Sequence, residues 1–479
     1  MRYFILLTFL CFSSLQVQAQ CLCDPLPPDQ GTIVTVNDVQ SLQQALSAAS
    51  QNNGNYTILL ESGTYSLSSN LLYIGTHMNN LTIRGVSGNR DDVIIEGQGM
   101  NGGVSHIFNV AADNFTVADM TIGWVANHPI QIHAEHDADN SLVRNVRFVD
   151  ANEQMLKVSG SSSSTYSDNG RVECCLFEFP AGQGNQWYTG GIDAHRARNW
   201  EVRYNTFRNI KSPDSGLSEH AIHFWSLSEN TLVENNLIIN CDRGIGFGLG
   251  NSSTQGHYGG IIRNNIIHTT RDVGIGLERS RNTKIYNNTI HTLSYFNSIE
   301  YRFDSTYNAH IVNNLVNENI VSRNGGMALV ENNHTFTGTS IFNFAAGHDY
   351  HLATSIPEIV NQGMVLSDVG MDYDCETRTM GGAPDIGADE WFEEATSIDN
   401  NFEDESFSIY PNPFNNYLTV ESIDHGELKI TDVSGKEIYT ALVNDHTEMV
   451  HNLEPLPTGV YIVIFSTEQI TIFRKLVKH

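Results

Sequence analysis

Positively charged residues are scarce in this chain. Lysine and arginine number 26 among 479 residues, against 54 aspartates and glutamates, so the formal net charge is −28. This excess of negative charge argues against nucleic acid and anionic membrane surfaces as partners, because both are polyanions. A polyanionic polysaccharide would be repelled at long range as well, so its binding would require a local cluster of Lys, Arg or His, or a bound cation.

Cysteines and long apolar runs are also scarce. Of seven cysteines, Cys11 lies in the N-terminal apolar segment, and six are too few for a disulfide scaffold in so long a chain. No pair has zinc-ligand spacing with a matching second pair. Cys174 and Cys175 are adjacent, so in a strand they point to opposite faces, and one is expected to fill the core. Beyond the N-terminus, no stretch is long and apolar enough to span a bilayer.

The N-terminus predicts export. Residues 1–19 combine an early Arg2, an apolar run over residues 3–12 and a small-residue cleavage pattern that ends at Ala19. These features are typical of a secretory signal peptide. We therefore expect cleavage after Ala19 and an exported protein without a transmembrane segment, acting as a monomer.

A repeat dominates residues 117–331. Each copy has an aliphatic residue, a variable one, a small polar pair and an apolar pair, as in Ile262-Arg-Asn-Asn-Ile-Ile267. Copies begin at Val117, Val143, Val172, Val202, Val233, Ile262, Ile285 and Ile311. Subtracting these positions gives steps from 23 (262 to 285) to 31 (202 to 233), a period that indicates a parallel β-solenoid with stacked turns. We expect the Asn pairs to adopt left-handed conformations at one corner and to form a hydrogen-bonded ladder.

A second strand in each repeat carries chemically active residues. Because side chains alternate along a strand, two columns of residues face outward. The first column contains Gln131, Lys157, Asp193, His223, Gly246, Gly276 and Glu300. The second contains His133, Ser159, His195, Trp225, Gly248, Glu278 and Arg302. Strands of adjacent coils lie about 4.8 Å apart, so we expect a shared patch of Lys157, Asp193, His195, His223 and Trp225, beside an open groove left by the glycines.

This patch has the residue types that β-elimination requires. A polysaccharide lyase removes a proton beside a uronate carboxylate, so it needs a base, a positive group on the carboxylate and a donor for the leaving oxygen. The catalytic candidates are Lys157, His195, His223 and Arg243. The candidates for contact with sugar are Gln131, His133, Arg196, Trp225, Glu300 and Arg302. We expect burial among cationic neighbours to lower the pKa of Lys157 toward neutrality, which would make the amine usable as a base.

A divalent ion is the cofactor that this face could hold. The metal-ligand candidates are Asp193, Glu219 and Glu278, with His195 or His223 as imidazole donors. A carboxylate with an imidazole suits zinc, manganese or iron better than calcium, which prefers oxygen ligands. The alternative is that these residues are hydrogen-bonded structural groups in a polar column.

Two other functions fit the same face. Hydrolysis needs two carboxylates, about 5–5.5 Å apart for retention or about 6.5–9.5 Å apart for inversion. Asp193 could form such a pair with Glu219, Glu278 or Glu300. The third interpretation is a non-catalytic, glycan-binding or adhesive solenoid. The concentration of titratable residues on one strand face argues against it.

The segments on either side of the repeats are predicted to close the solenoid. Residues 39–50 have the apolar spacing of a helix and would cap the first coil. Residues 351–391 are predicted to be irregular closing structure. Early strands are predicted at 56–60, 81–85 and 93–97.

An acidic linker at 392–405 separates the β-helix domain, residues 20–391, from a small β-sandwich at 406–479. Strands of this module are predicted at 418–420, 427–431, 437–439 and 459–465, with a turn at 433–435. The module resembles the type A C-terminal sorting domain of the type IX secretion system. The matching motifs are Tyr410-Pro-Asn-Pro413, Asp432-Val-Ser-Gly-Lys436, Leu456-Pro-Thr-Gly-Val-Tyr461 and Lys475-Leu-Val-Lys478. The resemblance implies the type IX machinery as a partner, export across an outer membrane, and release or attachment at the cell surface.

The solenoid resembles right-handed parallel β-helix proteins, especially the polysaccharide lyases of family 6, the alginate and chondroitin lyases. The matching segment is Glu153-Gln-Met-Leu-Lys157-Val-Ser-Gly, which follows an Asn-containing corner. The resemblance implies an all-β, right-handed parallel β-helix that cleaves a uronate-containing polysaccharide. It also implies that Lys157 is the catalytic lysine and that calcium is the family's metal ion.

Overall fold

The chain forms two compact units, residues 1–392 and 393–479. The computed structural model describes residues 23–160, 164–250, 252–378 and 381–391 and, with short gaps between strands, 407–478. The predicted signal peptide, linker and 433–435 turn lie outside the described residues. Among the residues that are described, no helix has the length and apolar character needed to cross a membrane.

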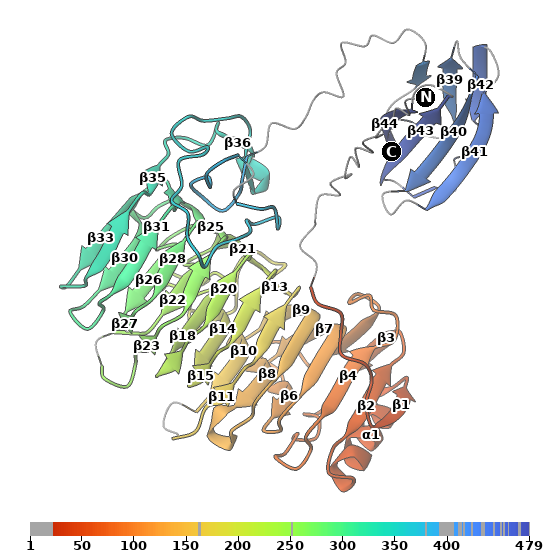
Figure 1. Ribbon diagram of the computed structural model, residues 1–479. Helices are drawn as coiled ribbons and strands as arrows, with labels where there is room; N and C mark the ends of the chain where they lie inside the picture. Colours follow the sequence, from red (N-terminus) through yellow and green to blue (C-terminus); the bar gives the residue numbers. More distant parts are fainter. Residues whose placement is uncertain are drawn as a thin grey trace, which may run out of the picture. The chain divides into compact units, whose positions relative to one another are not determined.

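The first unit is a solenoid of stacked coils, as the repeat predicts (Figure 1). Its outer walls are three parallel sheets, because each strand pairs with the equivalent strand of the next coil. The nine-stranded sheet contains β6 (His106–Val110), β8 (His128–His133), β10 (Gln154–Ser159), β14 (Gly190–His195), β18 (Ile222–Trp225), β22 (Ile245–Phe247), β26 (Ile275–Glu278), β30 (Asn297–Arg302) and β33 (Asn319–Arg323). The five-stranded sheet contains β11 (Ser167–Asp168), β15 (Ala197–Arg198), β19 (Ser228–Glu229), β23 (His257–Tyr258) and β27 (Ser280–Arg281).

The third wall is a 21-stranded sheet in which most coils contribute two strands. It contains β1 (Thr32–Val36), β2 (Tyr56–Leu60), β3 (Gly63–Ser66), β4 (Leu81–Gly85), β5 (Val93–Glu96), β7 (Thr116–Val125), β9 (Leu142–Ala151), β12 (Arg171–Glu173), β13 (Leu176–Glu178), β16 (Glu201–Arg203), β17 (Thr206–Arg208), β20 (Leu232–Glu234), β21 (Leu237–Cys241), β24 (Ile261–Arg263), β25 (Ile266–Thr269), β28 (Lys284–Tyr286), β29 (Thr289–Thr292), β31 (Ala309–Val312), β32 (Leu315–Val316), β34 (Ala328–Glu331) and β35 (His334–Thr335). The predicted strands at 56–60, 81–85 and 93–97 are β2, β4 and β5.

The strand register confirms the alignment of the repeats. The first aliphatic residues of consecutive copies pair across coils, from Val117 with Val143 to Ile285 with Ile311. In the nine-stranded sheet, the register reproduces the first predicted outward column from Gln131 to Glu300. In the second column it pairs His133 with Ser159, His195 with Trp225, and Glu278 with Arg302. The inward residues between them are buried in the core, for example Ile192, which is fully buried. The periodicity of the sequence therefore determines which side chains share a face.

Buried asparagines form the expected ladder at one corner. In the pair Asn264-Asn265, the first residue has a left-handed φ of 53° and the second is fully buried. The Asn265 amide donates to Asn288 Oδ1 at 2.9 Å and to the Val233 carbonyl at 3.0 Å. The ladder runs through Asn205, Asn236, Asn265, Asn288, Asn314 and Asn333. Asn recurs here because it tolerates the left-handed bend and its amide satisfies backbone groups that the bend leaves unpaired.

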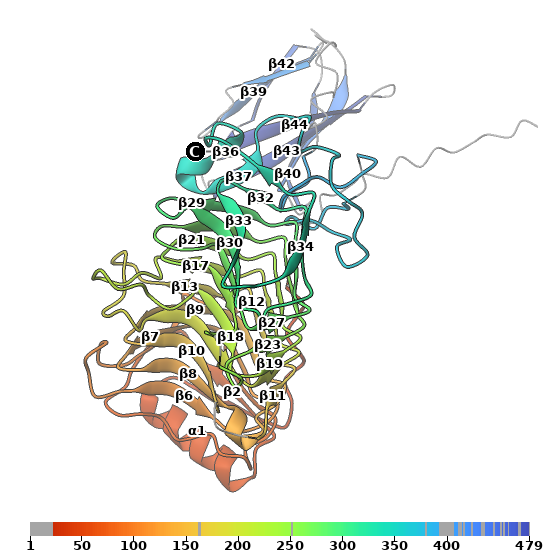
Figure 2. The ribbon, with the colours of Figure 1, turned by 90° about the vertical axis from the view of Figure 1, so that its left-hand side faces the viewer.

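A helix caps the N-terminal end, as predicted. Helix α1 (Val39–Gln51) begins after Asp38, whose side chain accepts a backbone hydrogen bond within the first turn, and Figure 2 shows α1 at one end of the stack. Its buried residues are Leu42, Ala45, Leu46 and Ala49. A disulfide joins Cys23, at the start of the described residues, to Cys174 between β12 and β13, whereas Cys175 is buried in the core. One of the two adjacent cysteines thus fills the core, as expected.

The C-terminal end of the solenoid is closed by the antiparallel pair β36 (Phe342–Phe344) and β37 (Asp349–Leu352) and by loops. Short 3-10 turns lie at Ala134–His136 and Ala345–Gly347. After Leu352, the described residues of the first unit contain no regular helix or strand. Apolar side chains of this closing segment, including Tyr350 and Ile386, pack over coil residues such as Ile266. They keep the last coil from presenting an open apolar edge.

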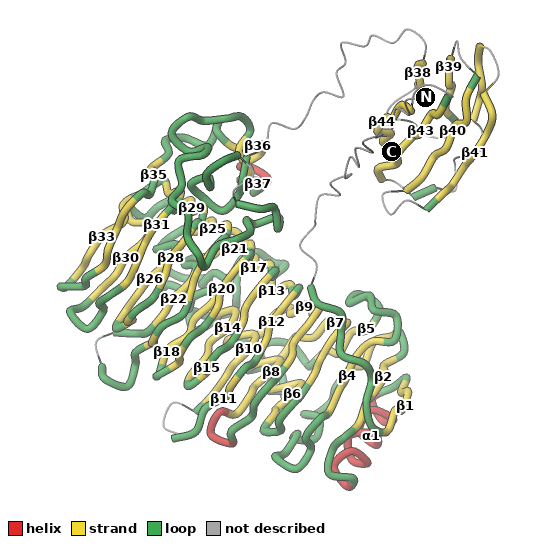
Figure 3. The backbone as a smooth tube through the Cα atoms, viewed as in Figure 1, coloured by secondary structure: helices red, strands yellow, loops and turns green. Residues whose placement is uncertain are grey.

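The second unit has two antiparallel sheets, and Figure 3 shows that it is built from strands. One sheet contains β38 (Phe407–Tyr410), β39 (Leu418–Ser422) and β42 (His446–Val450); the other contains β40 (Gly426–Asp432), β41 (Glu437–Val443), β43 (Gly459–Ser466) and β44 (Thr471–Lys478). The four predicted strands correspond to β39, β40, β41 and β43. The sequence reading missed β38, β42 and β44, and the basic end of the chain is a full strand paired with β43.

Candidate functional site

Asp193 is the centre of a polar cluster on the outer side of β10, β14 and β18. Its carboxylate forms an ion pair with Lys157 Nζ. Trp225 Nε1 donates to Asp193 Oδ1 at 2.6 Å, and His223 Nδ1 lies 3.4 Å from the same oxygen. His195 Nε2 lies 3.4 Å from Asp193 Oδ2 and 3.2 Å from Lys157 Nζ. Stacking of three coils thus brings together the five residues that the sequence placed in one patch.

The cluster is buried, whereas the sequence predicted an open patch. Lys157 is 7% exposed, Asp193 3% and His223 1%. The loop before β14 crosses this face, since Gln154 Nε2 donates to the carbonyl of Tyr188 at 3.0 Å. Long insertions before β14 and β18 therefore cover side chains that a bare solenoid would expose to solvent.

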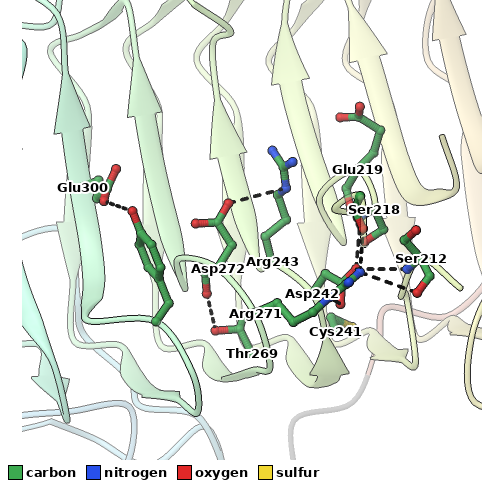
Figure 4. A network of polar contacts seen from close by, with 12 residues as sticks. Ser212, Ser218, Glu219, Cys241, Asp242, Arg243, Thr269, Arg271, Asp272 and Glu300 are labelled. Carbon is green, nitrogen blue, oxygen red and sulfur yellow. Dashed lines mark hydrogen bonds and ion pairs between the residues drawn. The ribbon is translucent and has the colours of Figure 1, made fainter. Parts of the chain in front are cut away.

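Asp242 fixes the second of these loops. Its carboxylate accepts from the backbone N–H groups of Ser212 at 2.9 Å and Ser218 at 3.0 Å, and it pairs with Arg271 (Figure 4). Burial opposes the charge on Asp242, but the hydrogen bonds from Arg271 and the two backbone groups hold its pKa below the ordinary value. The loop that ends at Glu219 is thereby attached to the following coil.

The pKa of Lys157 in this cluster differs from the predicted one. Burial by itself would lower the pKa of Lys157, but the charge of Asp193 outweighs it and raises that pKa. The expectation of a lysine with a pKa near neutrality was therefore wrong. Burial lowers the pKa of His195, so this imidazole is neutral at pH 7. The Asp193 carboxylate is also buried, but its cationic and hydrogen-bonding neighbours hold its pKa well below the ordinary value.

A cavity of about 280 Å³ lies beside the cluster. Its charged lining residues are His220, Arg243, Asp272, Glu278, Glu300, Arg302 and Arg323. Arg243 and Asp272 point toward each other, with Nε 3.8 Å from Oδ2, and Glu300 projects from a later coil (Figure 4). The Nε atoms of Arg243 and Arg302 are buried without a hydrogen-bond partner. Each of these atoms faces a carboxylate at longer range, Asp272 Oδ2 at 3.8 Å from Arg243 and Glu300 Oε2 at 4.0 Å from Arg302, so a ligand carboxylate would compete with these groups for them.

His220 connects the cavity with the cluster, and the sequence reading missed it. Its ring lies 4.7 Å from that of His223, and it occupies the space beside Gly246, where an added Cβ would come within 2.8 Å of the imidazole. The glycine column was expected to leave an open groove, but at Gly246 a histidine fills that space. The local signal was the spacing Glu219-His220-x-x-His223, which places a second imidazole near the first.

These residues are also the candidate metal ligands on this face. Glu219, His220 and His223 each offer a ligand atom, and these atoms lie within 4.8 Å of one another. Burial holds the pKa of His220 well below the ordinary value, so the ring is a neutral donor. Two imidazoles with one carboxylate fit zinc, manganese or iron better than the calcium that the family resemblance implies. Of the other two proposed ligands, Asp193 is ion-paired with Lys157, and Glu278 accepts a hydrogen bond from Arg302 Nη1 at 2.6 Å.

The remaining sugar-binding candidates divide into two groups. Glu300 and Arg302 line the cavity, although Glu300 is buried and accepts from Tyr295 and Asn297, each at 2.6 Å. Gln131 and His133 lie on β8, beyond β10, where His133 Nδ1 lies 2.7 Å from Glu135 Oε1.

Arg196 does not join either group. Its Nε donates to the Thr165 carbonyl at 3.0 Å and its guanidinium lies 4.6 Å from the centre of the Tyr166 ring. The chain bends at Arg196, where φ is 50°, so this side chain follows neither outward column. A better aromatic candidate for sugar contact is Trp187, which is 53% exposed in the loop before β14 and was not selected from the sequence.

Two families match parts of the chain. "Right handed beta helix region" matches residues 190–362, and "Secretion system C-terminal sorting domain" matches residues 408–479. These matches confirm the right-handed β-helix and the sorting domain. The chain is therefore exported by type IX secretion, to the cell surface or the medium. No curated protein matches the chain.

Several solved structures are similar to parts of the chain at low identity. A PL6 family alginate lyase is 15% identical with a TM-score of 0.39, covering 60% of this chain and 44% of its own. A GH87 α-1,3-glucanase from Streptomyces thermodiastaticus is 13% identical with a TM-score of 0.38, covering 65% and 70%. PfbA, a surface adhesin of Streptococcus pneumoniae, is 15% identical with a TM-score of 0.41, covering 62% and 88%.

Proposed function

We propose that this exported β-helix protein is a polysaccharide lyase that cleaves a uronate-containing polymer by β-elimination. The observation that carries the proposal is the arrangement of Lys157 and His195. Their nitrogen atoms lie 3.2 Å apart, and both groups are held by Asp193. One is a cation and the other a neutral base, which are the two states that an elimination needs.

The pair can supply both proton transfers. His195 is neutral because burial lowers its pKa, so it can accept a proton. Lys157 is protonated because Asp193 raises its pKa, so it can donate one. In the elimination, the proton beside the carboxylate passes to the base, the C–O bond at the neighbouring carbon breaks, and the leaving oxygen takes a proton from the acid. Asp193 acts as the positioning residue for both groups.

The cavity beside the cluster supplies the positive groups. A uronate carboxylate needs charge-assisted hydrogen bonds, and guanidinium groups provide them in a fixed planar geometry. Arg243 and Arg302 have buried, unpartnered Nε atoms at this cavity. Three arginines and three carboxylates line the cavity, so its lining lacks the negative excess of the whole chain, whose net charge is −28. The exposed ring of Trp187 is available for stacking on a sugar face.

A glycoside hydrolase is the second candidate, and one observation favours it. Asp272 lines the cavity, and burial raises its pKa, as a general acid requires. The second carboxylate would be Glu278 or Glu300, which line the same cavity. Both are engaged by other groups, through Arg302 for Glu278 and through Tyr295 and Asn297 for Glu300, so the lyase assignment is preferred.

A product assay with the full chain on alginate, on chondroitin and on neutral glucans separates these functions. The elimination catalysed by a base and a proton donor leaves unsaturated ends that absorb at about 230 nm. Reducing ends without this absorbance would indicate a hydrolase, and binding without products would indicate an adhesin. Either result contradicts the proposal.

Variants then test the assignment of the site. Lys157→Met and His195→Ala should each reduce turnover about 100-fold or more, the scale of lost acid–base catalysis. Lys284→Met is the matched control, because Lys284 is also ion-paired, to Asp368 at 2.6 Å, but on another sheet. Wild-type rates in both site variants would exclude this cluster as the reaction centre.

A further inference from the structure

A second cluster of ionisable groups lies in the closing segment of the solenoid. His351 is on β37, Asp374 is in the loop that follows it in the chain, and Asp389 is in the last segment of the first unit. One potential ligand atom from each of the three lies within 4.8 Å of the others. The fold thus brings together an imidazole and two carboxylates that are 15 to 38 residues apart (374 to 389 and 351 to 389).

The orientation of His351 is fixed from one side. Its Nδ1 lies 2.6 Å from Asp349 Oδ1, and its Nε2 lies 2.8 Å from Asp374 Oδ2. A carboxylate on one ring nitrogen sets the tautomer and turns the other nitrogen toward a ligand. Metal-binding histidines typically have this arrangement, in which an outer carboxylate orients the ring. Asp349 would be that outer group, and Nε2 would be the ligand atom.

The buried carboxylate of Asp389 is a second, independent indication that this cluster binds a cation. Its side chain belongs to a residue that is only 9% exposed. Among the residues that the structure describes, its carboxylate has no hydrogen bond or ion pair, and it faces the other two members of the cluster. An isolated buried carboxylate is costly, so such groups are normally paired or bind a metal ion.

Arg378, the arginine whose charge acts on Asp389, does not balance the carboxylates of the cluster. Arg378 is buried and donates to Glu390 Oε1 at 2.8 Å, to Asn264 Oδ1 at 2.7 Å and to the Ala388 carbonyl at 2.6 Å. Asp372 is fully buried close by and adds further negative charge. The cluster therefore has more carboxylates than cations, and a divalent ion would balance them.

We propose that His351 Nε2, Asp374 and Asp389 bind a divalent transition-metal ion of the zinc class. One imidazole and two carboxylates, with water in the remaining position, form a donor set that such ions accept. Calcium fits less well because it prefers six to eight oxygen ligands. The ion would fasten residues 385–391, the end of the first unit, to β37 and to the intervening loop. Its role is structural, and it is independent of the proposed lyase chemistry.

The test is zinc binding by the full chain after metal removal with EDTA and dialysis. Titration with ZnCl₂, followed by calorimetry and metal analysis, measures affinity and stoichiometry. Asp389→Asn keeps the shape and removes the ligand charge, so affinity at this site should fall about tenfold or more. Asp368→Asn, which changes an aspartate paired with Lys284, is the matched control and should bind as wild type does. His220→Ala removes the other candidate metal cluster and should leave this binding event in place.

Stability provides a readout that distinguishes a metal site from an ion-pair network. Zinc should raise the melting temperature of His220→Ala, which keeps only this site, but not that of the double variant His220→Ala/Asp389→Asn. If zinc fails to bind, or if His220→Ala alone abolishes binding, the site does not exist as described. Neither result bears on the lyase assay, which depends on a different cluster.

Discussion

The ion pair between Lys157 and Asp193 can be tested by a double-mutant cycle of Lys157→Met, Asp193→Asn and both together. The two side chains are 9% and 4% exposed, so neither charge is well hydrated. Removing one partner of a buried pair costs about 3–5 kcal/mol, because the other charge stays buried and unpaired. Asp193→Asn should reach that range. Lys157→Met should cost less, because Trp225 at 2.6 Å and His223 still face the carboxylate.

The double variant should lose less unfolding free energy than the two single variants lose together. With both charges gone, no unpaired ion remains, so the coupling energy should be about 2–3 kcal/mol. Chemical unfolding followed by circular dichroism and tryptophan fluorescence measures each free energy. The matched control is the Lys284–Asp368 pair, whose side chains are 40% and 35% exposed and whose removal should cost at most about 1 kcal/mol. If the losses in unfolding free energy of the two single variants add up to that of the double variant within about 0.5 kcal/mol, the two charges do not interact as a buried pair.

The pH dependence of Asp193→Asn supplies a second check on the same pair. Asp193 is the main group that raises the pKa of Lys157, so its removal leaves burial opposed only by Tyr188 and Glu219, and we expect that pKa to fall below the unfolded value. The unfolded chain then binds more protons than the folded one. The stability of this variant should therefore rise with pH, up to the ordinary lysine pKa of about 10.4. If the loss of stability in Asp193→Asn does not change with pH, the unpaired charge of Lys157 is not its cause.

Three further predictions follow from the same contacts. Burial lowers the pKa of His195, so this residue should act as a base at neutral pH and lose that function only below the ordinary imidazole pKa of about 6.5. If the initial rate already declines on acidification at a pH above about 6.5, this assignment is wrong. Asn265→Ala should cost about 3 kcal/mol in chemical unfolding because buried ladder groups lose their partners, whereas Asn169→Ala, in an exposed row with a 3.3 Å contact, should cost under about 1 kcal/mol; equal costs would exclude a special role for the buried ladder. Arg243→Gln should raise KM for a polyuronate about tenfold, by loss of about 1.4 kcal/mol, with the fold unchanged by circular dichroism; an unchanged KM would remove it from the carboxylate site.

Export and the proposed reaction depend on different parts of the molecule. Export follows from the C-terminal module, whose sequence motifs are recognisable without structure. The reaction depends on side-chain contacts among β10, β14 and β18, which solenoids of different activity need not share. The β-helix provides the scaffold, and the residues on it decide the chemistry.

The sequence by itself determined the coil stacking and the membership of the cluster. Val117 and its seven counterparts recur with one coil period, and parallel strands pair in register, so Lys157, Asp193 and His223 had to become neighbours. The Asn corners followed for the same reason, because each pair occupies one place in the repeat.

Only the tertiary structure decided how these residues behave. The loop that carries Tyr188 buries the cluster, and the resulting contact with Asp193 raises the pKa of Lys157 instead of lowering it. His220 fills the space beside Gly246, and Arg196 turns away at a bend. These outcomes depend on insertions between the strands, which have no period. Periodicity therefore specifies which side chains are adjacent, whereas burial and charge depend on irregular segments whose positions are set by packing.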